Sequence, residues 1–116
     1  MDPVDTITAR LRGDLKAAMQ AKRAGEMKVL RTLLGAIDNA QAVPVAETRG
    51  YVSRAFGDAS VEVPRLALSA EDIKAIFARE AASCRAAAAE MARFGQADRA
   101  ATLEAEAAIV DRYLDA

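Results

Sequence analysis

Apolar side chains recur at intervals of three and four residues along the stretch KVLRTLLGAIDNAQ, which runs from position 28 to position 41. At this spacing Leu30, Leu33 and Ile37 share one side of an α-helix, because an α-helix has about 3.6 residues per turn. Three further stretches repeat the pattern, and alanine, the best helix former, dominates the apolar residues. The sequence therefore predicts an all-α fold, specifically a four-helix bundle.

Local signals at the ends of these stretches indicate where the helices begin and end. Asp2 can cap the first helix and Pro3 suits its first turn, whereas Gly25 is expected to end or kink that helix. Ser69 and Asp72 occupy the outer positions of a capping box that opens the third helix. Within a single domain of residues 1–116, we predict helices at residues 2–24, 26–41, 69–94 and 97–115.

A long insertion, residues 42–68, separates the second and third predicted helices. Its two prolines and two glycines interrupt any long helix, yet its apolar content is too high for a simple linker. A structureless segment of this length is unusual inside a compact domain, so we expect the insertion to be partly ordered and partly irregular. A short helix around residues 46–55 is one arrangement, and a β-hairpin that turns at Gly57 and Asp58 is the other.

The formal net charge is −1, which excludes a strongly positive field over the whole molecule. Cations nevertheless outnumber anions before position 32, and anions dominate after position 70. The single cysteine forms no internal disulfide, which fits a reducing compartment. With no stretch of transmembrane length and no signal-peptide core, the sequence predicts a cytoplasmic protein without a membrane partner.

Few residues are suited to catalysis or to metal binding. The chain has no histidine, its carboxylates are not spaced as metal ligands, and it lacks Walker and GxGxxG sequences. Cys84 lies on the apolar side of the third helix without a histidine to act as its base, so we interpret it as a buried structural residue. We therefore expect no metal, no cofactor and no catalytic residue.

Glu80 lies at the edge of the apolar side of the third helix, where a carboxylate needs a partner. Arg31 of the second helix, or Lys16 or Arg12 of the first, could reach it across the bundle. One interpretation is an interhelical salt bridge that fixes the helix register. The other is a polar site between helices, for which the candidates are Glu80, Arg31 and Glu106.

Basic side chains are concentrated in the first two helices, and they would share a surface if these helices pair as an antiparallel hairpin. Cations spaced along a rigid face suit a nucleic-acid backbone. A merely solvated face is the simpler interpretation, because interleaved aromatic residues are missing. The candidate nucleic-acid-binding residues are Arg12, Lys16, Lys22, Arg23, Lys28 and Arg31.

Four pieces of the sequence, DLKAAMQAK, LRTLLGAI, LSAEDIKAIFARE and FGQADRAATLEAEAAIVDRYL, resemble the GatB/YqeY family. This family comprises the tail region of the GatB subunit of the tRNA-dependent amidotransferase and small free-standing YqeY-like proteins. The resemblance covers nearly the whole chain apart from residues 42–65. It implies the first, four-helix bundle of the family's fold, without the second bundle.

The resemblance implies that the chain is a YqeY-like accessory module, non-catalytic and associated with tRNA or another RNA. Two alternatives stay open. One is a protein–protein interaction or assembly module, acting with a protein partner or as a homo-oligomer. The other is carbon–nitrogen ligase activity with glutamine as amido-N-donor, which family descriptions imply and which we do not expect from the isolated chain.

Overall fold

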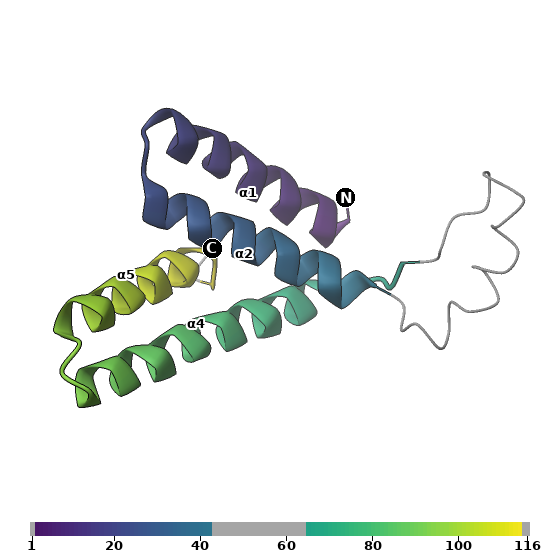
Figure 1. The fold of residues 1–116 in the computed structure, drawn as a ribbon. Helices are drawn as coiled ribbons and strands as arrows, with labels where there is room; N and C mark the ends of the chain where they lie inside the picture. The colour runs from purple at the N-terminus through teal and green to yellow at the C-terminus, as the bar shows by residue number, and fades with distance from the viewer. Residues whose placement is uncertain (1, 43–64, 115–116) are drawn as a thin grey trace, which may run out of the picture.

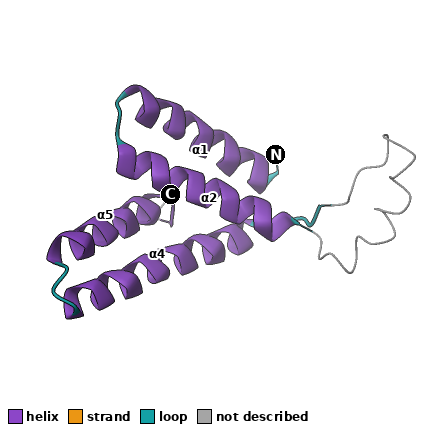
Figure 2. Cartoon of the chain, viewed as in Figure 1, coloured by secondary structure: helices purple, strands orange, loops and turns teal. Residues whose placement is uncertain are grey.

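The computed structural model describes residues 2–42 and 65–114 of the chain. This part contains four helices and no strand: α1 (Pro3–Gln20), α2 (Ala24–Gln41), α4 (Ala70–Arg93) and α5 (Ala97–Leu114) (Figure 1). The all-helical prediction is therefore confirmed for the described residues (Figure 2). The helix predicted around residues 46–55 and the alternative hairpin at Gly57 and Asp58 lie outside them.

The helices form two antiparallel hairpins, α1 with α2 and α4 with α5, whose turns lie on the same side of the molecule (Figure 1). α2 packs on α1, on α4 and on α5, and α4 packs on α5, on α2 and on α1, so these two helices join the hairpins. The end of α2 and the residues that precede α4 lie side by side. Ala42 and Arg65 form an isolated antiparallel bridge, and the Leu66 N–H donates to the Gln41 carbonyl at 2.8 Å.

Side-chain caps begin α1 and α4 as the sequence predicts. The Val4 N–H donates to Asp2 Oδ1 at 2.9 Å, with Pro3 in the first turn. At the start of α4 the Asp72 N–H donates to Ser69 Oγ at 3.1 Å, and the Ser69 N–H donates to Asp72 Oδ2 at 2.9 Å. These bonds satisfy N–H groups that the first turn of a helix leaves unpaired.

The prediction that Gly25 ends the first helix is wrong. Gly25 lies within the first turn of α2, and α1 ends earlier because Lys22 adopts a left-handed conformation with φ of 58°. The Arg23 N–H then donates to the Ala18 carbonyl at 2.9 Å, which closes a Schellman motif. Gly95 takes the same role after α4, with φ of 75°.

The core lies where the two hairpins cross. Phe77 of α4 is its largest fully buried side chain, and its ring meets the Tyr113 ring of α5 edge to face at a centroid distance of 6.4 Å. Leu11 of α1 and Leu30 and Leu33 of α2 belong to the same buried cluster. Both hairpins are therefore held by one apolar core.

Helical spacing in the sequence predicts Met19 and Phe94 as members of the apolar stripes of the first and third helices, but both lie on the surface. Met19 is 49% exposed and Phe94 is 70% exposed. Both lie near the turn ends of their hairpins, and the hairpins diverge toward those ends (Figure 1). The helical spacing is right at these positions, but the opposite hairpin does not cover them.

Candidate nucleic-acid interface

Ion pairs divide the six candidate cations into two groups. Arg23 Nε lies 2.6 Å from Glu26 Oε2, and Lys28 Nζ lies 2.9 Å from Glu106 Oε1. The other four are exposed and form no ion pair within residues 2–42 and 65–114. We call these four residues the cationic face: Arg12, Lys16, Lys22 and Arg31.

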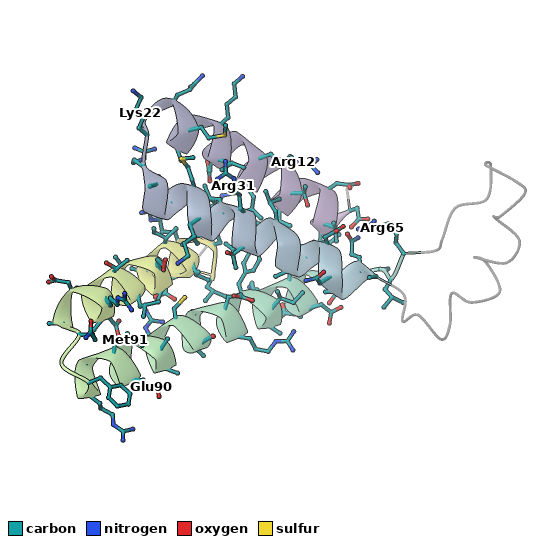
Figure 3. All side chains as sticks on the ribbon, viewed as in Figure 1. Arg12, Lys22, Arg31, Arg65, Glu90 and Met91 are labelled. Carbon is teal, nitrogen blue, oxygen red and sulfur yellow. The ribbon has the colours of Figure 1, made fainter. Side chains whose placement is uncertain are left out.

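An open groove between α1 and α2, about 650 Å³ in volume, shows how these cations are arranged. Its lining includes Asp5, Thr8 and Arg12 of α1 and Leu34, Gly35 and Asp38 of α2. Lys16 lies one turn beyond Arg12, and Arg31 lies one turn before Gly35, so the three cations follow the same side of the hairpin. Arg12 and Arg31 lie along this hairpin, with Lys22 at its turn (Figure 3).

Negative charge limits this surface at the opposite end of the groove. Asp5 and Asp38 line the groove there. Asp38 forms an ion pair with Arg65, and Arg65 also donates a hydrogen bond to Gln41 Oε1 at 3.1 Å. The positive charge of the hairpin is therefore concentrated between Arg12 and the turn at Lys22.

Two residues of the predicted interhelical polar site, Glu80 and Glu106, lie at one cavity, and the third, Arg31, does not line it. Glu106 is only 4% exposed, and its partner is Lys28 rather than Arg31. Glu80 and Glu106 line the same cavity of about 160 Å³, together with Cys84 and Lys28. Arg31 lies one turn after Lys28 on α2, but it is not among the described residues that line this cavity.

Burial and the charged side chains around this cavity raise the pKa of two of its residues, Lys28 and Cys84. The hydrogen bond to Glu106 and the charge of Glu106 raise the pKa of Lys28, so its ammonium is more firmly protonated. Burial, followed by the charges of Glu106 and Glu80, raises the pKa of Cys84. A thiol held in its protonated form is a poor nucleophile, and half-buried Cys84 therefore has no electrostatic activation.

Several contacts that join the hairpins were not predicted from the sequence. The Tyr113 hydroxyl donates to Asp14 Oδ2 at 2.6 Å, and the Arg10 guanidinium lies 4.6 Å from the centre of the Tyr113 ring. Arg112 Nη1 lies 2.6 Å from Glu26 Oε1. Tyr113 follows buried Val110 by three residues, so helical spacing alone could have placed it in the core.

Comparisons with known proteins leave the family unassigned. No family model, no curated protein and no solved structure matches the chain. Within residues 2–42 and 65–114, no three side chains of histidine, cysteine, aspartate or glutamate are grouped as metal ligands. None of the helices described combines the length and the apolar character that crossing a membrane requires.

Proposed function

We propose that the chain is a non-catalytic RNA-binding module that holds the phosphate backbone with its cationic face, with tRNA as the first candidate ligand. The observation that supports this proposal is the arrangement of Arg12, Lys16 and Arg31 on one side of the α1–α2 hairpin, without ion pairs among the described residues. Cations that are not neutralised internally are available to displace counterions from phosphates. The choice of tRNA rests on the GatB/YqeY resemblance.

Arg23 and Lys28, two of the candidates, have a different role in this proposal. Arg23 lies against Glu26, and Lys28 lies against nearly buried Glu106. Each cation has a carboxylate partner within the fold, which Arg23 shares with Arg112, so binding phosphate would compete with that partner. We therefore assign backbone contacts to the four members of the cationic face only.

Fluorescence anisotropy with labelled bulk tRNA tests the proposal. Four phosphate contacts give a log–log salt slope of about −3, so affinity should fall about 60-fold between about 50 and 200 mM salt. The triple variant Arg12→Gln/Lys16→Gln/Arg31→Gln should retain about one contact, and its affinity should fall only about threefold over that range. Absence of binding by the native chain at low salt would refute the function.

The matched control removes three cations from the other hairpin. Arg79→Gln/Arg93→Gln/Arg99→Gln changes the net charge by the same amount, and these three exposed residues also lack ion pairs among the described residues. The proposal predicts that this control binds tRNA with nearly the native affinity and salt slope. Equal loss in both triple variants would mean that net charge, not the cationic face, governs binding.

A second candidate function, self-association through the α4–α5 turn, is favoured by Phe94. This ring is 70% exposed, and Arg93 precedes it at the end of α4. Phenylalanine and arginine are both enriched in the buried core of protein–protein interfaces relative to the rest of the surface. Light scattering should then show an oligomer that Phe94→Ser converts to a monomer; a monomeric native chain would exclude it.

Carbon–nitrogen ligase activity with glutamine as the amide donor has only the family resemblance behind it. We propose no residue of this chain for such a reaction.

A further inference from the structure

A second groove lies on the part of the molecule where α1, α4 and α5 meet, and the cationic face takes no part in it. Its volume is about 320 Å³. Its apolar lining consists of Pro3, Ile7 and Ala70 at the surface and of the buried residues Ile73, Phe77 and Tyr113 beneath them. Arg10 of α1 and Lys74 of α4 supply its positive charge. Three separate helices therefore combine an apolar surface with two cations in one depression.

The position of Arg10 is fixed by Tyr113. The Arg10 guanidinium lies 4.6 Å from the centre of the Tyr113 ring, a distance typical of a cation–π interaction. The ring is itself fixed, because its hydroxyl donates to Asp14 Oδ2 at 2.6 Å and its edge meets Phe77. Arg10 forms no ion pair with any described residue, so its N–H donors are available to a ligand.

Lys74 supplies the second positive charge from the first turns of α4. It is exposed and forms no ion pair within the described part of the chain. Glu71 lies one turn before Lys74 on α4, but no carboxylate is among the described residues that line the groove. Asp72 accepts the Ser69 N–H at the start of α4, Asp2 accepts the Val4 N–H at the start of α1, and neither lines the groove.

We propose that this groove binds a small amphipathic anion, with its apolar body against Pro3, Ile7 and Ala70 and its anionic group between Arg10 and Lys74. Charge complementarity selects the occupant: both ionised side chains of the groove are cations, and its remaining lining is mostly apolar. The volume is near the lower end of the range of small-molecule sites, about 300–1,000 Å³, which favours a ligand with a short chain or a single ring. A carboxylate and a phosphate monoester share the required chemistry.

Titration of the ¹⁵N-labelled full chain with octanoate tests the proposal directly. Amide shifts should be concentrated at residues 4–10, 70–77 and 113, which surround the groove. Octyl phosphate in a parallel titration distinguishes the two anionic groups, and whichever binds more tightly identifies the class of ligand. Octylammonium carries the same chain with the opposite charge, so it should bind at least about tenfold more weakly.

Matched variants separate a specific site from general attraction to a charged surface. Arg10→Gln/Lys74→Gln should weaken octanoate binding about tenfold or more, whereas Arg12→Gln/Lys16→Gln should leave it unchanged. Lys74→Gln alone should also weaken binding, and it leaves the contact between Arg10 and the Tyr113 ring intact. This single variant serves as the test if the double variant is unstable. Ala70→Phe, which places a ring at the groove, should also weaken binding.

Three results would overturn the proposal. They are equal affinity for octanoate and octylammonium, equal weakening in both double variants, and the absence of shifts around the groove at millimolar ligand. Binding of tRNA by the cationic face does not enter this test, so either proposal can fail alone.

Discussion

The ion pair between Lys28 and Glu106 provides the sharpest test of how the two hairpins are held together. The Glu106 side chain is 6% exposed, whereas that of Lys28 is 68% exposed. Lys28→Met removes the cation and leaves a nearly buried carboxylate without its partner. The carboxylate then loses its compensating charge but gains no contact with water.

The expected loss of stability lies between the values for surface and buried pairs. Exposed pairs contribute about 0–1 kcal/mol, and breaking a buried pair costs about 3–5 kcal/mol. Because the Lys28 ammonium reaches water while Glu106 does not, we expect Lys28→Met to lower the free energy of unfolding by about 2 kcal/mol. For a domain of this length the melting temperature should fall by about 8 °C.

The double variant Lys28→Met/Glu106→Gln distinguishes a buried charge from simple loss of packing. Glutamine keeps the shape of Glu106 without its charge, so the double variant should be about 1 kcal/mol more stable than Lys28→Met alone. Urea unfolding followed by circular dichroism measures both values. A double variant that is less stable than Lys28→Met would refute the reasoning.

The pH dependence of Lys28→Met gives an independent readout. Pairing with Glu106 raises the pKa of Lys28, so the pair contributes stability that is fully present below the unfolded pKa of lysine. This contribution is lost as the pH rises through the raised pKa of Lys28 in the folded chain. The difference in stability between Lys28→Met and the native chain should therefore be smaller above about pH 11 than at neutral pH.

Three further predictions concern stability. Phe77→Ala should cost about 3–5 kcal/mol because its ring is fully buried, whereas Phe94→Ala should change stability by less than about 0.5 kcal/mol; urea unfolding measures both. Lys22→Gly should raise the melting temperature, with a gain of about 0.5–1 kcal/mol, because glycine adopts φ of 58° without steric cost. The hydrogen bond from Arg112 lowers the pKa of Glu26, so this pair stabilises the fold above the unfolded pKa of Glu26. Glu26→Gln should therefore lower the urea midpoint at neutral pH, and the effect should disappear as the pH falls through the folded pKa.

The candidate site was predictable only as a set of residue types. The sequence indicates six candidate cations in the region of the first two helices. It does not distinguish Arg31, which forms no ion pair among the described residues, from Lys28, which Glu106 neutralises. That distinction depends on which side of α2 faces α5, and helical periodicity does not specify the neighbour of each side. The groove at Arg10 and Lys74 escapes sequence reasoning for the same reason, since its two cations come from different hairpins.

The sequence by itself determined the helices and most of their ends. The signals that predict them act within one or two turns of a helix, so they can be recognised without knowledge of the fold. They are the apolar spacing, the Asp2 cap and the Ser69–Asp72 capping box. Only the tertiary structure decided that Phe77 is buried while Phe94, on the same apolar stripe, is exposed. The local sequence pattern determines which side of a helix is apolar, whereas the crossing of the two hairpins determines how much of that side is buried.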